Sequence, residues 1–362
     1  MRGLCRAYLG VMTALPALAA ACVILLSGCV TQLGYLGKQG QYLWKYSSGT
    51  QPVQGLLQSP ATPADTRDFL LRVSEIKSFA VESVGLRNNE NYTRYRDIDR
   101  DHLVDVVSAC DAVSFTSYFW SYPFLGKLPY KGFYERADAD AEAALLKKEG
   151  YDVIIRPVDA FSTLGFTKDP LYSFMKKYSL FELASMIIHE QTHATLFLNG
   201  QPQFNEELAV FVGDEGAFEW LSAKYGKDSE EYQAAVAEHE DSQTFISLLQ
   251  TLSGELEGLY SATGTRAEKL ARKAEIIGEF RKRLSGDLAS RFHSSSYKDL
   301  GKIPLNNAYL DLYRLYSSDI PLFRAYWALR CDSSLSRFMK AEKYLAAHGD
   351  VKALMRQSLT GP

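Results

Sequence analysis

The sequence lacks the features that mark a nucleic-acid-binding protein or a disordered chain. Its 362 residues carry a formal net charge of -3, and it has no basic stripe with interleaved aromatic residues, so we expect no nucleic-acid partner. It also has no internal repeat and no low-complexity segment, while 46% of its residues are hydrophobic. What is left is an ordinary globular chain, long enough for one large domain or two modest ones.

Long apolar runs are scarce too, and one of them stands at the N-terminus. A basic start precedes an apolar run over residues 9–26, a pattern typical of an export signal. The run ends in LSGC at 26–29, which resembles the bacterial lipobox. The resemblance implies that a signal peptide of residues 1–28 is removed and that Cys29 is lipidated, which anchors the protein to a membrane without spanning it. An uncleaved signal anchor is the alternative, because the run is almost long enough to cross a bilayer.

Cysteines are few, and most of them belong to the export segment. Two of the five lie within the signal and Cys29 follows it, so Cys110 and Cys331 are the thiols left in an oxidising compartment. They can form a disulfide or stay as two buried free thiols, and the sequence leaves both open. Val30 stands where lipoprotein sorting rules place Asp for inner-membrane retention. By resemblance to those rules, we expect a lipoprotein of the bacterial cell envelope, in the outer membrane and facing the periplasm.

Strand signals are short and lie in the first half of the chain. Residues 104–115 are β-branched and bounded by charge, which predicts a strand. Residues 151–165 form an extended segment, and Pro157 confines it to a sheet edge or a bulge because proline cannot donate to the ladder. An edge strand can bind an extended peptide through its main chain.

Helical patterns account for most of the rest. Residues 229–290 carry dense charge over a helical period, which predicts a long helical hairpin that turns at SATGT and has its charges on a solvated face. We predict an α+β, predominantly α-helical fold, in which residues 29–60 form a lipidated linker with a packing helix and residues 61–362 form one domain. Shorter helices are expected after an N-cap at Asp65 or Thr66, over 137–150 and over 305–357.

One helical segment, residues 178–198, carries an H-E-x-x-H motif. The i, i+4 spacing puts His189 and His193 on one face, where two ring nitrogens can reach one zinc ion at about 2.0–2.1 Å. Glu190 is rotated off that face, so it fits the general base that takes the proton of a zinc-activated water. The alternative is a pair of core histidines bonded to carbonyl groups, with Glu190 in a salt bridge. His239 has no histidine at i+4 and is expected on ordinary helix surface.

A catalytic zinc usually takes three protein ligands, and Glu206 is the candidate for the third. Gly200 and Pro202 predict a turn into a second, antiparallel helix, which brings Glu206 back toward the two histidines. Small residues on the same stripe of that helix let the two helices approach closely. Glu207 points elsewhere, either into solvent or behind the ligands. The alternative for Glu206 is pairing with the N-terminal helix dipole.

The order of motifs is similar to that of known zinc peptidases. H-E-x-x-H followed by N-E-x-x-A at 205–209 resembles the gluzincin metallopeptidases, although fewer residues separate the two motifs here than in well-known members. The stretches YKGF, RPVDAFSTLGF, FNEELAVFVGDEGA and NNAYL occur in the order found in a bacterial family of predicted aminopeptidase lipoproteins. Nearly the whole chain after the signal resembles this family. The resemblance implies a zincin-like (gluzincin) catalytic core with a small edge sheet and a zinc cofactor, to which the long helical hairpin is added.

A zinc peptidase needs further residues around the metal. Arg156, Ser162 and Thr163 lie in the segment that resembles the zincin edge strand, and we expect them to line the peptide groove. An aminopeptidase also needs an acidic pocket for the α-ammonium group of its substrate. Acidic side chains are available between 214 and 219, although nothing in the sequence shows that they face the cleft.

These features predict a membrane-anchored zinc metallopeptidase, an aminopeptidase that hydrolyses peptides with Glu190 as general base. A second electrophile should stabilise the oxyanion, and Tyr309 is the first candidate, ahead of Tyr316 and Tyr130. The expected partners are a peptide substrate and the membrane, reached through the lipid on Cys29. Two alternatives stay open: a zinc endopeptidase acting on envelope proteins, and a non-catalytic envelope lipoprotein that binds a protein partner through its hairpin.

Overall fold

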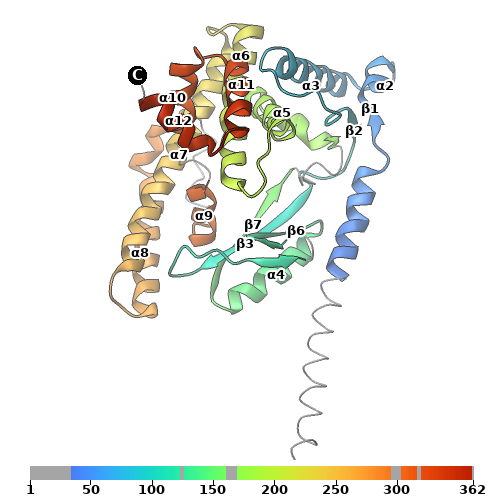
Figure 1. Ribbon diagram of the computed structural model, residues 1–362. Coiled ribbons are helices and arrows are strands. Elements are labelled where there is room, and N and C mark those ends of the chain that lie inside the picture. Colours follow the sequence, from blue (N-terminus) through green and yellow to red (C-terminus); the bar gives the residue numbers. More distant parts are fainter. Residues whose placement is uncertain (1–33, 123–125, 160–168, 295–302, 316–318, 361–362) are drawn as a thin grey trace, which may run out of the picture. The chain divides into compact units, whose positions relative to one another are not determined.

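The computed structural model describes residues 34–122, 126–159, 169–294, 303–315 and 319–360 (Figure 1). The chain divides into two units, residues 1–50 and 51–362. The described residues of the first unit include a helix over 34–47. No helix within the described ranges is both long and apolar enough to span a membrane. Cys29 and the expected signal peptide lie outside the described residues.

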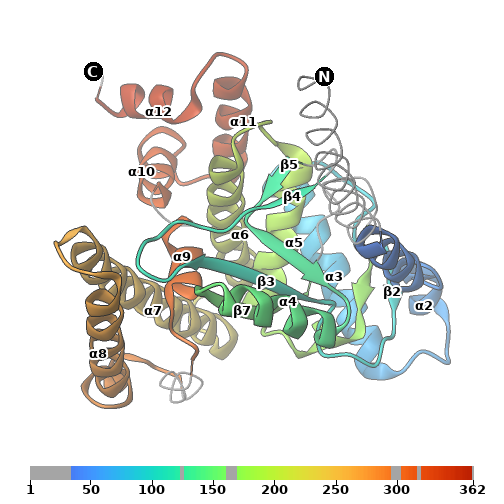
Figure 2. The same cartoon turned by 90° about the horizontal axis from the view of Figure 1, so that it is seen from below.

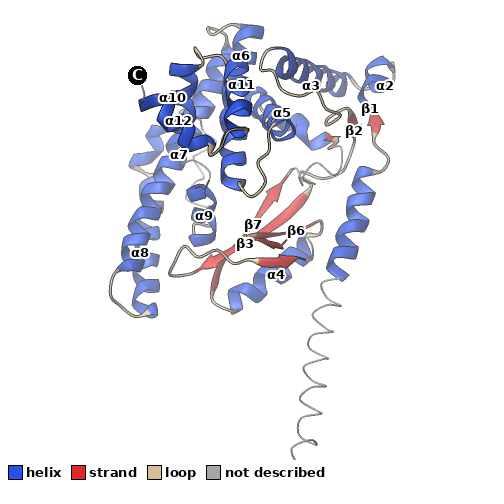
Figure 3. Cartoon of the chain, viewed as in Figure 1, coloured by secondary structure: helices blue, strands red, loops and turns tan. Residues whose placement is uncertain are grey.

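Helices make up most of the second unit, and its described strands form three small sheets (Figure 3). The prediction of a predominantly helical α+β fold is therefore confirmed. The strands are β1 Gln51–Pro52, β2 Arg94–Arg96, β3 Val104–Asp111, β4 Trp120–Tyr122, β5 Gly126–Leu128, β6 Tyr130–Phe133, β7 Tyr151–Val158 and β8 Leu171–Tyr172. The helices are α2 Val53–Gln58, α3 Ala64–Glu82, α4 Arg136–Lys148, α5 Leu180–Thr195, α6 Pro202–Tyr225, α7 Glu230–Ser261, α8 Arg266–Ser285, α9 Asn307–Leu315, α10 Ile320–Arg330, α11 Leu335–Ala346 and α12 Val351–Thr360, with 3-10 helices at Ser173–Lys177 and Asp287–Arg291.

The main sheet has β3 at its centre, with β6 and β7 paired to it in antiparallel fashion. All residues of β3 except the last are buried, as a central strand requires. The strand predicted over 104–115 forms at 104–111 and gives way to a turn from residue 112, and the extended segment predicted from 151 forms a strand over 151–158. β7 lies at an edge of this sheet, which is where Pro157 can be accommodated. Helix α4 lies across β3 and β7 on one face (Figure 2).

The opposite face of the main sheet turns toward helix α9. Side chains alternate between the two faces along a strand, so Ile154 and Arg156 of β7 share one face. Ile154 packs with Cys110 of β3 and Ala308 of α9. Arg156 therefore lies on the face that α9 covers, away from α4.

A tight turn joins α5 to α6, as the sequence predicts. Gly200 adopts a left-handed backbone conformation with φ of 77°, and Pro202 occupies the first turn of α6. The side chain of Asn205 closes the turn: its Oδ1 accepts a hydrogen bond from the N–H of Leu198 at 2.8 Å, and its Nδ2 donates to the carbonyl of Leu198 at 2.9 Å. The asparagine of the N-E-x-x-A motif thus sets the angle at which α6 begins.

Helices α5 and α6 pack very closely because α6 has a glycine at their contact. A Cβ atom at Gly213 would lie 2.8 Å from the carbonyl oxygen of Ser185 and 3.2 Å from the Cβ of His189. The start of α5 is fixed by a capping box, in which the hydroxyl of Ser179 accepts from the N–H of Glu182 and the carboxylate of Glu182 accepts from the N–H of Ser179. Gly213 therefore sets the distance between the two helices, and the capping box sets the residue at which α5 begins.

The predicted helical hairpin is confirmed as α7 and α8. Its turn ends at Thr265, which caps α8 in a capping box with Glu268. Apolar side chains of both helices, such as Leu252 and Ile276, form one cluster with Leu310 of α9. This cluster joins the hairpin to the helix that covers the main sheet.

The expected N-cap of helix α3 is wrong. The helix begins at Ala64 with Pro63 in the N-cap position, and no side chain caps it. Proline already has the φ that a helix start needs. Asp65 instead lies in the first turn, where its carboxylate accepts a hydrogen bond from Lys176 Nζ at 2.6 Å, and Thr66 is buried.

The two cysteines of the described chain are free and buried. Cys110 packs on β3 against the α9 side, and Cys331 follows the end of α10. Burial raises the pKa of Cys110 to about 12 and that of Cys331 to about 11, so both thiols stay protonated near neutral pH. Of the two alternatives left by the sequence, the structure has the free thiols.

Candidate metal centre

Three potential metal ligands lie together where α5 meets α6. His189 and His193 come from successive turns of α5, and Glu206 comes from the N-terminal part of α6. The two histidine Nε2 atoms are 3.1 Å apart, and carboxylate oxygens of Glu206 lie 3.6 Å from the Nε2 of His189 and 3.5 Å from that of His193. Among the described residues, this is the group whose ligand atoms could share one ion.

The triangle of donor atoms has the size that zinc requires. Donors about 2.0–2.1 Å from a tetrahedral zinc ion lie about 3.3–3.5 Å from one another, and the three distances here run from 3.1 to 3.6 Å. Two imidazoles and one carboxylate are also a donor set that zinc takes in catalytic sites. The side chain of Glu206 is 39% exposed, so the group is open on one side.

The pKa shifts of His193 and Glu206 favour the unprotonated forms that bind a metal, whereas that of His189 does not. Burial and the charge of His189 together lower the pKa of His193 to about 4, while the charge of Glu206 opposes this shift. Burial opposes ionisation of Glu206, but its hydrogen bond to His189 and the charges of both histidines hold its pKa below the usual value. Burial lowers the pKa of His189, but the hydrogen bond to Glu206 and the charges of Glu190, Glu206 and Asp214 outweigh it and raise the pKa, so a bound metal would displace a proton from this ring.

Glu190 lies beside this group and faces the space around it. Its side chain lines both cavities that adjoin the centre. Burial raises its pKa; His189 opposes this shift and Glu206 adds to it. Asp169 lies nearby, and burial together with the charge of Glu190 raises its pKa to about 7. A carboxylate with raised proton affinity is well suited to accept a proton near neutral pH.

Two cavities meet at the centre. One has a volume of about 1300 Å³ and extends between the start of α5 and α7. The other has about 940 Å³ and extends toward β7, α9 and α10. The two cavities adjoin at His189 and Glu190, so the cleft extends from the centre in two directions. Residues that line both cavities are His189, Glu190, Asp214, His239, Ser242, Ile246 and Tyr313.

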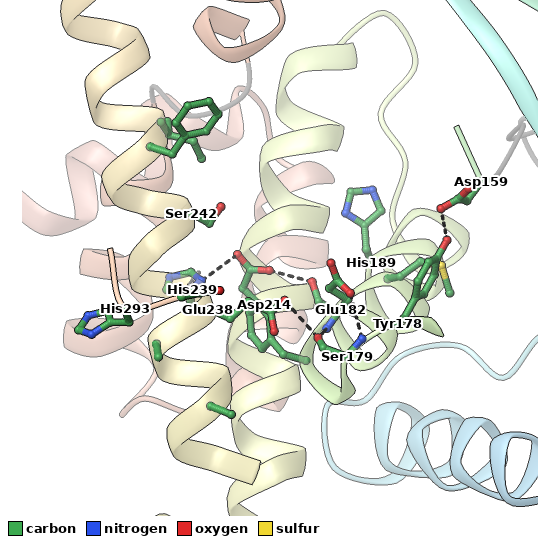
Figure 4. Close-up of a pocket in the computed structure, with 18 of the residues that line it drawn as sticks. Asp159, Tyr178, Ser179, Glu182, His189, Asp214, Glu238, His239, Ser242 and His293 are labelled. Carbon is green, nitrogen blue, oxygen red and sulfur yellow. Dashed lines mark hydrogen bonds and ion pairs between the residues drawn. The ribbon is translucent and has the colours of Figure 1, made fainter. Parts of the chain in front are cut away.

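The prediction that His239 lies on ordinary helix surface is wrong. Its side chain is 18% exposed and forms part of both cavity walls, with Nδ1 3.7 Å from the carboxylate of Asp214 (Figure 4). Asp214 also accepts a hydrogen bond from Ser185 Oγ at 2.7 Å, so one carboxylate connects α5, α6 and α7. Glu238 faces the first cavity and accepts a hydrogen bond from Ser179 Oγ at 3.1 Å. The charges of α7 are therefore not all solvated, because this face of the helix meets α5 and α6.

Two of the acidic residues that follow Glu206 reach the second cavity. Asp214 and Glu215 line it, and Glu215 forms an ion pair with Arg324 of α10 at 2.6 Å. Glu219 lines neither cavity, and burial together with the charge of Glu215 raises its pKa to about 7. The acidic wall beside the centre is thus Asp214 and Glu215.

Of the three predicted groove residues, Arg156 lies at the cleft. It lines the second cavity together with Glu190 and Glu206. Its Nε atom is buried and has no hydrogen-bond partner within the described part of the chain. Ser162 and Thr163 lie outside the described residues. Arg156 therefore contributes a cationic side chain to the wall of the space where a peptide would lie, while its Nε atom is buried within that wall.

Two of the three candidate tyrosines are near the centre. Tyr309 of α9 lines the second cavity, and its hydroxyl is 3.3 Å from that of Tyr313. Tyr130 of β6 is 37% exposed. Burial and the charge of Glu206 raise the pKa of Tyr130, while Arg156 opposes the shift. The third candidate, Tyr316, lies outside the described residues.

The alternative of a solvated Glu207 is wrong. This residue is completely buried behind the candidate ligands. Its carboxylate accepts hydrogen bonds from Lys352 Nζ at 2.7 Å and from the backbone N–H of Asp319 at 3.2 Å. These two partners belong to the C-terminal part of the chain, more than a hundred residues away, so no local sequence pattern indicates them. A third donor, Gln203 Nε2 at 3.2 Å, lies one turn earlier on α6.

The fold and the site together define a predominantly helical α+β protein with a two-histidine, one-glutamate group that could hold a metal ion. The chain belongs to the family described as "Putative aminopeptidase", whose model matches residues 34–356. Searches of the curated proteins and of the solved structures return no match to this chain.

Proposed function

We propose that this protein is a zinc-dependent aminopeptidase with a zincin-like catalytic core. The observation that carries the proposal is the group of His189, His193 and Glu206, whose donor atoms lie 3.1–3.6 Å apart next to Glu190. Membership of the family supports peptidase chemistry. Zinc held by these residues would lower the pKa of a water molecule and polarise the scissile carbonyl.

In this proposal Glu190 is the group that moves protons. It faces both cavities and has a raised proton affinity, so it can take a proton from the attacking water and deliver it to the leaving amine. Arg156 can hold a carbonyl or carboxylate group of the peptide through its guanidinium group, because the residue lines the second cavity. Tyr309 is the first candidate to donate a hydrogen bond to the oxyanion, and Tyr130 is the second.

The charges around the two cavities support an aminopeptidase. An acidic lining can hold the α-ammonium group of a substrate, and the second cavity offers Arg156 and Arg324 to the rest of the peptide. One observation favours the alternative of a zinc endopeptidase acting on envelope proteins, namely that the cleft extends from the centre in two directions. The acidic lining that supports the aminopeptidase is that of the first cavity, whose carboxylates are Asp159, Glu182, Glu190, Asp214 and Glu238.

The test combines metal analysis with Glu190→Gln. We expect the purified protein to bind one zinc ion, and Glu190→Gln to keep the metal while its kcat on an aminoacyl amide falls by at least about 100-fold, because the general base is lost. Glu231→Gln, on the exposed start of α7, is the control and should keep full activity. Unchanged hydrolysis in Glu190→Gln, or no zinc in the wild-type protein, would contradict the proposal.

Peptides with free and acetylated N-termini then separate the two peptidase classes. An aminopeptidase needs the α-ammonium group and should cleave the acetylated peptides at least about 100-fold more slowly. Equal rates on both sets would favour the endopeptidase.

We also propose that the enzyme is held at the periplasmic face of the outer membrane by lipid on Cys29. The support is the LSGC sequence at 26–29. Cys29→Ala should release the protein from the membrane fraction, and a variant that stays membrane-bound would argue for an uncleaved signal anchor.

A further inference from the structure

A buried ion network ties the C-terminal helix α12 to the part of α6 that carries Glu206. Lys352 of α12 donates hydrogen bonds to the carboxylates of Glu207 at 2.7 Å and Asp319 at 2.6 Å. Asp319 stands at the start of α10, and its backbone N–H donates to Glu207 at 3.2 Å. Arg356, one turn after Lys352, donates to Asp319 at 2.8 Å. Three helices therefore meet at one glutamate side chain.

The depth of the network distinguishes it from a surface ion pair. Glu207 has no exposed side-chain surface, and the side chains of Lys352 and Asp319 are 18% and 21% exposed. Exposed pairs contribute little because water competes with them. A buried charge that loses its partner, in contrast, is strongly unfavourable, so the three groups must keep this arrangement in the folded protein.

The network adjoins the candidate metal centre along the backbone of α6. Glu206 and Glu207 are consecutive residues, so whatever fixes one of them limits the movement of the other. Glu206 must keep its two oxygens 3.5–3.6 Å from the histidine nitrogens of α5. Gly213 sets how closely α6 approaches α5, and the bonds to Glu207 hold α6 from the opposite side.

We propose that Lys352 is a positioning residue for the metal centre, and that it holds Glu206 at the ligand distance by binding Glu207. The inference rests on the proposed zinc site. It makes the C-terminal helix, 145 residues beyond Glu207 in the chain, part of the metal-binding machinery. Residues that orient metal ligands in this way typically change metal affinity by about 10- to 100-fold when they are replaced.

The experiment measures the zinc Kd of the full chain by competition with a chromophoric chelator at pH 7. Lys352→Met should raise Kd by about 10- to 100-fold, and Lys352→Arg should bring it back to within about threefold of wild type, because arginine can bridge the same two carboxylates. The matched control is Lys273→Met, which removes a similarly buried lysine from its pair with Asp152 between α8 and β7. Lys273 lines neither cavity, so its loss should lower stability while Kd changes by less than about threefold.

A second variant covers the case in which Lys352→Met does not fold. The double variant Glu207→Met with Lys352→Met leaves no unpaired charge behind, and we expect the same 10- to 100-fold weakening of zinc binding. Wild-type affinity in the folded Lys352→Met protein or in the double variant, or an equal effect of Lys273→Met, would overturn the inference while the proposed zinc site stands. A wild-type protein without zinc would overturn the proposed function and this inference together.

Discussion

Glu342 on α11 is as fully buried as Glu207 on α6, yet the two carboxylates have different surroundings. Glu207 is surrounded by donors, among them Lys352. Neither oxygen of Glu342 has a hydrogen-bond partner in the described part of the chain. Burial alone raises the pKa of Glu342 to about 8. At the scale of the residue, the difference lies in the partners: donors surround the carboxylate of Glu207, whereas burial without a partner raises the pKa of Glu342.

This difference predicts a pH-dependent gain in stability for Glu342→Met. Between pH 5 and 8 folded Glu342 holds a proton that the unfolded chain has released, so the free energy of unfolding falls as pH rises through this window. Methionine has a similar length and no charge to bury. We expect the variant to be more stable than wild type by about 1–3 kcal/mol at pH 9, with a smaller gain at pH 5. Urea unfolding at both pH values measures this, and an equal difference at the two values would contradict it.

At the scale of the element, the α5–α6 pair carries the three candidate ligands. Its spacing depends on Gly213, where a side chain would meet the backbone of Ser185 and the Cβ of His189. Its angle depends on the turn that Asn205 closes with Leu198. Two local features therefore bring the third ligand to the first two.

Gly213→Ala should consequently destabilise the protein, although alanine usually favours a helix. The added methyl group has to push α5 and α6 apart at the turn of His189, which should cost about 1–3 kcal/mol and weaken zinc binding. Gly254→Ala on α7 is the control, because nothing lies within 4 Å of a Cβ there, and it should stabilise the helix by up to about 1 kcal/mol. Chemical unfolding of both variants tests the prediction. A gain in stability at both positions would show that the contact at Gly213 is not tight.

At the scale of the whole molecule, the cleft has walls from distant parts of the sequence. Strand β7 supplies Arg156, α7 supplies His239, α9 supplies Tyr309 and α10 supplies Arg324. The candidate ligands themselves belong to two helices whose packing exists only in the folded chain. Metal binding and folding should therefore be linked.

The linkage predicts that zinc raises the thermal stability of the metal-free protein. Free zinc at 100 times its Kd should add about 2.7 kcal/mol to the free energy of unfolding, because the unfolded chain lacks the assembled site. A chelator should reverse the shift, and His193→Ala should abolish it. Magnesium at the same concentration is the control and should have little effect, since it prefers oxygen ligands. Equal melting temperatures with zinc and with chelator would contradict the prediction.

Much of the local structure is predictable from local patterns. The hairpin of α7 and α8, the strands β3 and β7, and the turn at Gly200 follow from periodicity, β-branching and turn residues. The N-cap of α3 is mispredicted because Asp65 is a good capping residue on its own, and its engagement with Lys176 depends on a segment more than a hundred residues away. The prediction that His239 lies on the helix surface is wrong for the same reason: it depends on a long-range contact. The helical pattern of α7 does not indicate which of its faces packs against α6.

The sequence by itself determines which residues can serve a metal, because the i, i+4 spacing of His189 and His193 and the short turn before Glu206 act over a few helical turns. Only the tertiary structure decides what surrounds them. It places His239 and Arg324 around the cleft, and it buries Glu207 against Lys352. Such contacts join elements that lie far apart in the chain. They depend on how whole helices pack against one another, and a local stretch of sequence does not specify that packing.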